Sequence, residues 1–205
     1  FVILILSSSC SKKEVKVDTV ANDSDRSYEV YREALEEMES GDYFIASKKF
    51  AEAENILPKV EFAAKASLMS SYALYLINFY EDATAGLEGF IKKYPADKNI
   101  PYVYYLLIII QYEQILDESK DLGPLIISKK KIEDYLVNFS DTEYALDLKF
   151  KMDLINNQLA AKELYVAKYY IKTQKWIPAI NRLKTIVKDY EQTIFIEEAL
   201  HRLVE

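Results

Sequence analysis

The only cysteine of this 205-residue chain lies near its beginning, in the stretch FVILILSSSC. Phe1 to Leu6 are apolar like the end of a secretory h-region, and the three serines that follow are small residues suited to a signal peptidase. A cysteine in that place is the residue that bacterial lipoproteins acylate. We therefore predict that residues 1–9 are a truncated lipoprotein signal peptide and that Cys10 is the lipid-attachment residue. An uncleaved membrane anchor and an ordinary cysteine after an apolar segment are the alternatives.

Other residues with catalytic or metal-binding potential are scattered along the chain. His201 is the only histidine, whereas a zinc site needs several histidine or cysteine ligands. The pairs Glu36-Glu37 and Glu197-Glu198 fall on polar helix faces, which is typical of solvated charge rather than of a general acid and base. The four glycines form no phosphate-binding loop. The sequence therefore predicts no enzymatic activity, no metal site and no cofactor.

The composition limits the class of protein further. A net charge of −7 argues against a nucleic-acid partner, which would require a basic surface, and Lys129 to Lys131 are most simply a solvated helix face. Few glycines and prolines favour long helices. The most apolar stretch, Pro101 to Ile110, is ten residues long, about half of what a bilayer span needs, and we interpret it as part of a buried helix.

The segment that follows the cysteine is polar and mixed in charge. Residues 11–27 read SKKEVKVDTVANDSDRS and have no apolar periodicity. Such composition is typical of disorder. We therefore predict a lipidated cysteine and flexible tether over residues 10–27, and a folded body over residues 28–205.

The folded body repeats one amphipathic pattern at offsets 0, 3, 7, 10 and 14, which place five residues on one side of a helix. The second position is small and the last is large in every copy, so we expect neighbouring helices to approach each other closely at the small residue. The four copies are Tyr43, Ala46, Phe50, Ala53, Leu57; Tyr80, Ala83, Leu87, Phe90, Tyr94; Leu125, Ser128, Ile132, Tyr135, Phe139; and Trp176, Ala179, Leu183, Ile186, Tyr190.

Each of these helices is preceded by another helical pattern. The first has a stripe of Tyr28, Tyr31, Leu35 and Met38, stops at Gly41, and is followed by Asp42 as a cap for the next helix. The corresponding patterns later in the chain cover 62–77, 102–116 and 144–171, the last of which we extend to a long helix from about 143 to 172. Ser140-Asp141-Thr142-Glu143 fits a capping box before it. A fifth unit starts at Phe195 and breaks off at the end of the sequence.

Helix pairs that recur at intervals of about 34 to 40 residues are the tetratricopeptide repeat (TPR) pattern, in which each pair buries its apolar face on the next pair. We therefore predict an all-α TPR solenoid of about five repeats, of which the last is truncated. Such a solenoid is normally a binding scaffold.

Specific residues add a family resemblance. The stretch from Gln158 to Leu203 contains Leu159-Ala160, Glu163, Tyr169-Tyr170, Trp176, Asn181-Arg182 and Asp189-Tyr190 in order, and the earlier part contains ESGDYFIASKKF, Tyr72 and Tyr75, GFIKKYP and NIPYVYYL. Over nearly all of residues 28–205 the chain resembles the BamD family, the TPR lipoproteins of the β-barrel assembly machinery. It departs from that family at Leu107-Ile108, at Phe139-Ser140 and at Glu191.

The resemblance implies an outer-membrane lipoprotein, lipid-anchored on the periplasmic side, that assists the folding and insertion of outer-membrane β-barrel proteins. It implies that the C-terminal repeats bind the POTRA region of the barrel subunit BamA, with Arg182 in an ion pair to an acidic POTRA residue. The other residues implied there are Asn181, Glu163, Tyr169 and Tyr170. Accessory Bam lipoproteins are implied as further partners.

The resemblance also implies that unfolded β-barrel substrates lie across an aromatic groove of the N-terminal repeats, for which we expect Tyr31, Tyr72 and Tyr75. Most tyrosines would serve helix packing instead. A different periplasmic TPR adaptor of the cell envelope is the alternative function, and a helical enzyme would need polar residues that converge in one pocket.

Overall fold

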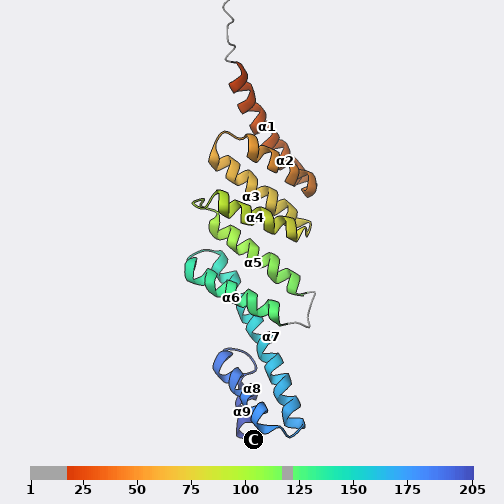
Figure 1. Ribbon diagram of the computed structural model, residues 1–205, viewed down its shortest axis with the longest axis vertical. Helices are drawn as coiled ribbons and strands as arrows, with labels where there is room; N and C mark the ends of the chain where they lie inside the picture. Colours follow the sequence, from red (N-terminus) through yellow and green to blue (C-terminus); the bar gives the residue numbers. More distant parts are fainter. Residues whose placement is uncertain (1–17, 117–121) are drawn as a thin grey trace, which may run out of the picture. The chain divides into compact units, whose positions relative to one another are not determined.

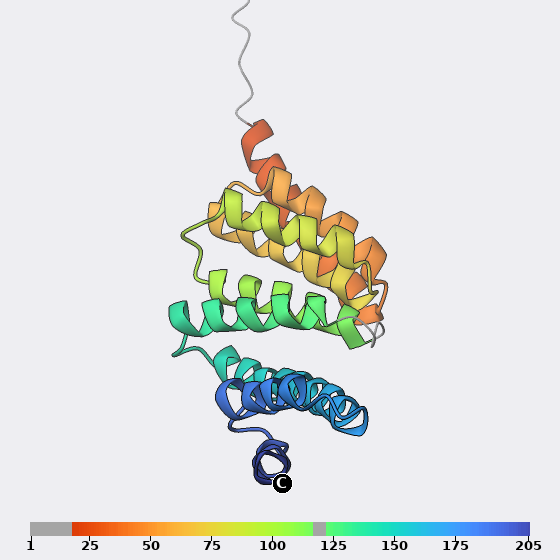
Figure 2. The same cartoon turned by 60° about the horizontal axis from the view of Figure 1, so that its bottom comes forward.

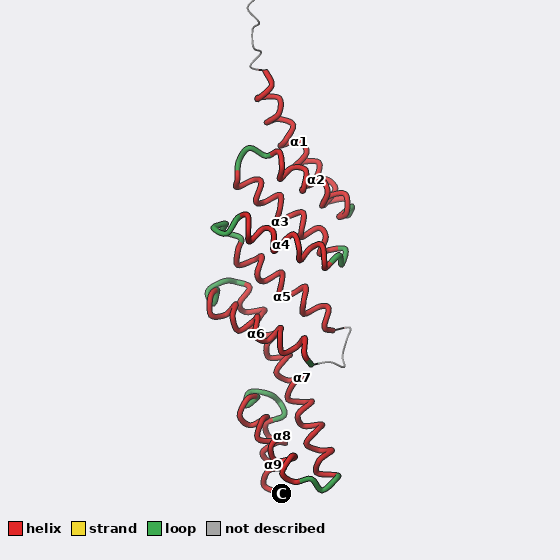
Figure 3. The backbone as a smooth tube through the Cα atoms, viewed as in Figure 1, coloured by secondary structure: helices red, strands yellow, loops and turns green. Residues whose placement is uncertain are grey.

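The computed structural model describes residues 18–116 and 122–205, and in those ranges every regular element is an α-helix (Figures 1 and 3). The helices are α1 (Asp18–Ser40), α2 (Tyr43–Ile56), α3 (Val60–Leu76), α4 (Tyr80–Lys93), α5 (Ile100–Leu116), α6 (Gly123–Asn138), α7 (Tyr144–Lys172), α8 (Trp176–Asp189) and α9 (Ile196–Val204). Consecutive helices pack as pairs, so the prediction of an all-α, TPR-like solenoid is confirmed.

The chain divides into two compact units, with the boundary between Gly86 and Leu87 inside α4. In the first unit, α1, α2 and α3 enclose a core of small and medium side chains around the fully buried Phe50. In the second unit, α5 and α6 pack on the N-terminal half of α7, and α8 and α9 pack with its C-terminal half. Figure 2 shows α7 and α8 lying side by side within that unit.

The turns inside three helix pairs share one backbone geometry. Gly41, Asn78 and Gln174 have positive φ angles of 88°, 60° and 57°. At each turn the next residue donates its N–H to a carbonyl five residues earlier, as in Asp42 to Glu37 (2.9 Å), Phe79 to Leu74 (3.0 Å) and Lys175 to Tyr170 (2.8 Å). This is the Schellman arrangement that ends a helix and reverses the chain. An aromatic residue then begins the second helix two positions after each left-handed residue.

The predicted repeat stripe is confirmed as the buried side of the second helices. The small residues Ala46, Ala83, Ser128 and Ala179 are at most 2 % exposed. Trp176 is the exception, because 59 % of it is exposed although the equivalent Tyr43 and Tyr80 are half-buried.

The structure corrects the start of the folded body. Helix α1 begins at Asp18, so residues 18–27 are helical where the sequence analysis predicted a tether. This stretch contains no proline or glycine, and adding residues to an existing helix costs far less than nucleating one, so the helix extends beyond the apolar stripe. Cys10, the signal segment and the rest of the tether lie outside the described residues.

Two predicted side-chain caps are wrong. Asp42 stands at the N-cap of α2, but its side chain makes no capping hydrogen bond. Helix α7 follows Glu143, which also makes no capping bond. The Ser140 hydroxyl donates to Asp141 (3.1 Å) and the Thr142 hydroxyl to the Phe139 carbonyl (2.8 Å), so these side chains close the preceding turn instead of forming a capping box.

The other predicted helix features agree with the structure. The long helix is α7, with 29 residues. Helix α2 ends at Ile56 and α4 at Lys93, directly before Leu57-Pro58 and Tyr94-Pro95, as expected because proline cannot continue a helix and restricts the residue before it. In the apolar segment of α5 the predicted burial holds for Val103, Leu106 and 108–110, whereas Tyr104 is 38 % exposed. None of the helices described is both long and apolar enough to span a membrane.

Candidate partner-binding surface

Helices α7 and α8 position the residues that the family resemblance selects in the C-terminal repeats. Ala160, Leu164 and Ala167 of α7 are buried against Leu183 and Ile186 of α8. Glu163 and Arg182 each lie next to one of these buried leucines, so the packing brings both to the same edge of the helix pair. The two residues are 19 positions apart in sequence.

Glu163 and Arg182 bond to each other. Arg182 Nη1 donates to Glu163 Oε1 and Oε2, both at 3.1 Å. The Glu163 side chain is only 18 % exposed, whereas that of Arg182 is 46 % exposed. Within the described residues the structure records no bond from Arg182 Nε or Nη2. Glu163 therefore holds one edge of the guanidinium, and its other edge remains open to an external carboxylate.

The other residues implied at this surface lie on the same helix pair. Asn181 is exposed, and its carbonyl accepts a hydrogen bond from Thr185 (3.1 Å). Tyr169 is 56 % exposed, and its ring centroid lies 5.8 Å from that of the half-buried Tyr170. Helices α7 and α8 together therefore offer a partner an ion-pairing group, Arg182, and exposed aromatic area. Whether all five residues contact one partner stays a prediction.

Sequence reasoning missed a link between this surface and α6. Lys129 Nζ lies 5.1 Å from the ring centroid of Tyr190, a cation–π contact, and the Lys129 side chain is only 24 % exposed. Burial raises the pKa of Tyr190, and the nearby Glu163 and Asp189 carboxylates raise it further. The interpretation of Lys129 as part of a solvated face is therefore wrong, although Lys130 and Lys131 are exposed as expected.

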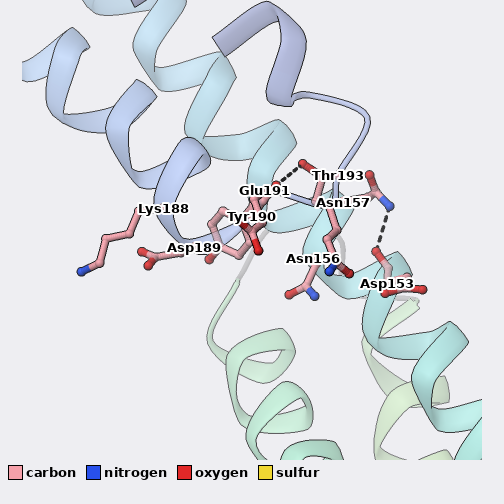
Figure 4. A pocket seen from close by; sticks show the side chains of 9 residues that line it. Asp153, Asn156, Asn157, Lys188, Asp189, Tyr190, Glu191 and Thr193 are labelled. Atoms are coloured by element: carbon pink, nitrogen blue, oxygen red, sulfur yellow. Dashed lines mark hydrogen bonds between the residues drawn. The ribbon is translucent and has the colours of Figure 1, made fainter. Parts of the chain in front are cut away.

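A polar pocket of about 190 Å³ lies beside Tyr190, between α7 and the loop from α8 to α9 (Figure 4). Asn157 Oδ1 accepts the Ile194 N–H (3.2 Å), and the Thr193 hydroxyl donates to the Tyr190 carbonyl (2.7 Å), so these bonds fix the loop. Asn156 Oδ1 is buried and has no partner among the described residues. The loop contains Glu191, where the family has proline. No pattern in the sequence indicated this pocket.

The tyrosines predicted to line a substrate groove have different surroundings. The Tyr31 ring packs edge-on against Phe50 at 5.4 Å. Its hydroxyl is buried without a partner in the described part of the chain, and burial raises its pKa. This placement favours helix packing for Tyr31. Tyr72 and Tyr75 are half-buried and have ring centroids 6.0 Å apart, and their groove role stays a prediction.

A second tyrosine cluster joins α5 to α7. Tyr105 stacks on Tyr144 at 4.9 Å, and Tyr102 contacts both rings. The Tyr105 hydroxyl donates to Asp147 Oδ2 (2.9 Å), and Lys151 donates to Asp147 Oδ1 (3.1 Å). Burial and then the Asp147 bond raise the pKa of Tyr105 well above its usual range.

Leu107 and Ile108, which depart from the family pattern, line a pocket of about 580 Å³ between α5 and α6, whose lining also includes the charged Lys131 and Asp134. Tyr104 and Phe139 also line it, and their rings stack at 5.7 Å. Residues at two of the positions that differ from the family pattern, Leu107-Ile108 and Phe139, therefore line the same pocket.

The fold and this surface are those of a TPR-like scaffold protein built of helix pairs. Among the residues described, no group of three or more histidine, cysteine or acidic side chains could hold a metal ion. The chain belongs to the YfiO family, described as outer membrane lipoprotein, whose model matches residues 23–205.

Relatives include proteins named outer membrane protein assembly factor BamD. The one from Rickettsia prowazekii is 34 % identical over 204 residues, which are 100 % of this chain and 80 % of the relative. The one from Caulobacter vibrioides is 32 % identical over 86 % of this chain, but that match covers only 58 % of the relative, less than two thirds. The one from Neisseria gonorrhoeae is 28 % identical over 83 % of this chain and 68 % of the relative.

Proposed function

We propose that this chain is a non-catalytic scaffold of the outer-membrane β-barrel assembly machinery, anchored by a lipid on Cys10 and facing the periplasm. It binds a BamA-type barrel subunit and unfolded β-barrel substrates, together with accessory lipoproteins. Membership of an outer membrane lipoprotein family and relatives named for outer membrane protein assembly support this proposal. The observation that carries it is the Glu163–Arg182 pair on the exposed edge of α7 and α8.

The geometry of Arg182 suits a charged partner. Its Nη1 is held by a carboxylate that is itself mostly shielded from water, so the side chain has less rotational freedom to lose on binding. The free edge presents Nε–H and Nη2–H, which match a carboxylate in a bidentate arrangement. We infer that an acidic residue of the BamA POTRA region binds there.

We assign the substrates to a different surface, in the N-terminal repeats. Tyr72 and Tyr75 on α3 remain the candidates for contact with an extended substrate strand, because their half-buried rings combine apolar area with a polar tip. Tyr31 is the weakest of the three predicted groove residues, since its hydroxyl is buried.

Co-purification tests the proposed function. The full-length chain carrying an affinity tag is expressed in its own bacterium, extracted from membranes with detergent and analysed by mass spectrometry. We expect the BamA-type barrel subunit to be the dominant partner and to be reduced at least tenfold with Arg182→Glu, since losing a desolvated charge pair costs about 2–5 kcal/mol. A membrane-bound, folded parent protein that brings down no barrel subunit would contradict the proposal.

The lipid anchor has its own test. We expect labelled palmitate to be incorporated into the parent and not into Cys10→Ser, because the variant lacks the cysteine that would be acylated. Two or three acyl chains anchor a protein firmly, so the variant should also be lost from the membrane fraction. Equal labelling and equal membrane fractionation of the two proteins would exclude Cys10 as the lipid-attachment residue.

A further inference from the structure

The charge of this chain is distributed very unevenly. Residues 144–190, which form α7, α8 and their connection, contain nine lysines and arginines and four aspartates and glutamates, so this segment has a net charge of +5. The whole chain contains 26 basic and 33 acidic residues, so the remainder has a net charge of −12. The α7–α8 hairpin is therefore a basic region in an acidic protein.

The loop of this hairpin is held by several hydrogen bonds, and its side chains are exposed. The Lys175 N–H bonds to the Tyr170 carbonyl (2.8 Å), and the Gln174 N–H bonds to the Ile171 carbonyl (2.9 Å). The Thr173 hydroxyl donates to the Tyr169 carbonyl (3.0 Å). These bonds fix the chain reversal, and every residue from 172 to 178 is exposed.

The exposed side chains at this loop are of two kinds. Tyr169, Trp176 and Ile177 are 56 %, 59 % and 74 % exposed, so large apolar and aromatic groups face outward. Lys172 and Lys175 lie between them in sequence and are also exposed, with no ion pair recorded within the described part of the chain. We call these five residues the hairpin tip.

We propose that the hairpin tip inserts its aromatic and apolar side chains into the interface of an anionic phospholipid bilayer. Tryptophan and tyrosine are the residues enriched at membrane–water interfaces, and lysines near them are attracted to anionic headgroups. A second copy of the chain is a poor occupant, because it would present the same two lysines. Membership of an outer membrane lipoprotein family places a bilayer surface near this chain.

The proposal does not depend on any protein partner. It requires membrane association alone, so it can fail while the proposed assembly function holds, and the reverse is also true. An acidic protein surface that covers the tip is the competing occupant, and the test below distinguishes the two.

Trp176 provides a direct readout, because it is the only tryptophan of the chain. The mature protein is reconstituted into vesicles of phosphatidylethanolamine and phosphatidylglycerol, and flotation first verifies that it is membrane-bound. We expect tryptophan emission to shift to shorter wavelength and to be quenched by phospholipids brominated near the headgroup end of the acyl chains. The same protein in vesicles of phosphatidylcholine alone should show much weaker quenching.

Charge variants define the contribution of the lysines. One lysine near an anionic surface contributes about fivefold to membrane partitioning, so Lys172→Glu with Lys175→Glu should lower the equilibrium constant for insertion of the tip by more than about 25-fold. The matched control is Lys130→Glu with Lys131→Glu, which makes the same change of net charge on exposed residues of α6 and should leave the quenching unchanged.

Three results would overturn the proposal. Trp176 could keep a water-like, unquenched emission in protein that floats with the vesicles. Quenching of the parent in neutral vesicles, and of the lysine variants in anionic vesicles, could equal that of the parent in anionic vesicles, which would exclude an anionic surface as the occupant. Finally, the spectral shift could occur only when the soluble POTRA region of the barrel subunit is added in detergent, which would make the tip a protein-docking surface.

Discussion

At the scale of single residues, Arg182 has two roles to reconcile. Its bond to Glu163 is internal, whereas the family resemblance implies a bond to a partner. The geometry allows both, because Nη1 carries the internal bond, no bond from Nε or Nη2 is recorded within the described residues, and the side chain is 46 % exposed. Glu163 is then a positioning residue whose carboxylate orients the arginine.

The internal pair makes a prediction for stability. Arg182→Glu places two carboxylates beside each other, and we expect the free energy of unfolding to fall by about 1 kcal/mol, in the range of partly exposed pairs. The reversed pair, Glu163→Arg with Arg182→Glu, should recover most of this loss. Chemical denaturation followed by circular dichroism measures both, and a reversed pair no more stable than the single variant would show that the contact contributes nothing.

Tyr105 provides a pH-dependent prediction. Its pKa is raised by burial and by the bond to Asp147, so the folded state disfavours the ionised phenol. The stability that this group contributes is complete below the unfolded pKa of about 10 and is lost as the pH rises above that value toward the folded pKa. Tyr105→Phe should cost about 1–2 kcal/mol at neutral pH through the lost hydrogen bond.

The alkaline comparison is the diagnostic part. The difference in unfolding free energy between the parent and Tyr105→Phe should shrink as the pH increases from 9 to about 11, because the variant has no phenol to ionise there. A difference that stays constant over this range would contradict the Tyr105–Asp147 contact between α5 and α7.

At the scale of helices, the sequence predicted the parts that depend on periodicity. Ala46, Ala83, Ser128 and Ala179 are buried as their register requires, and the long helix predicted from about 143 to 172 is α7. These features follow from the spacing of apolar residues along one helix, which is visible without knowledge of the neighbouring helices.

Features that depend on geometry between segments were not predictable. Asp42 and Ser140 have the residue types of caps, but capping depends on side-chain rotamers and local backbone angles. The bond of Glu163 to Arg182 and the contact of Lys129 with Tyr190 join residues on different helices. Trp176 fits the repeat pattern and is nevertheless exposed, because burial of that position depends on what packs against α8.

Two glycines of α4 form a matched pair for testing helix packing. A Cβ at Gly86 would overlap with Ser71 Oγ of α3, whereas a Cβ at Gly89 would meet no atom within 4 Å. Gly89→Ala should therefore stabilise the protein by about 0.5–1 kcal/mol through helix propensity. Gly86→Ala should destabilise it by about 1–3 kcal/mol, as overpacking does.

The partner residue supplies the control for Gly86. Replacing Ser71 by glycine removes the atoms that the new methyl group would meet, so Gly86→Ala should cost less in the Ser71→Gly background than in the parent. Melting temperatures measured by calorimetry report both comparisons. Equal effects of the two glycine substitutions would contradict the close approach of α3 and α4 at this point.

The repeat register predicts a further contrast. Ala83 and Ala179 are 0 % and 2 % exposed, and Leu at either position should lower stability by about 1–3 kcal/mol because the core has no room for the added methylenes. Lys92→Leu on the exposed side of α4 should have little effect. Thermal unfolding in which all three variants melt together would contradict the register.

At the scale of the whole molecule, the chain combines an acidic body with a basic C-terminal hairpin. Opposite charges in separate regions favour oriented binding, because they steer one region toward an acidic partner and repel it from the rest of the surface. Two uses of the basic region lie at different places on the hairpin. Arg182 and Glu163 form an edge suited to a protein carboxylate, and the tip with Trp176 is suited to a bilayer.

We infer that the free edge of Arg182 binds an acidic residue of a BamA-type barrel subunit. The most direct measurement is the affinity of the full chain for the purified POTRA region, compared among the parent, Arg182→Glu and the reversed Glu163→Arg, Arg182→Glu pair. We expect the parent to bind, and both variants to bind at least tenfold more weakly although the reversed pair is folded as stably as the parent. Full recovery of affinity in the reversed pair would exclude a direct contact of Arg182 with the partner, because the salt bridge would then be needed only to hold α7 and α8 together.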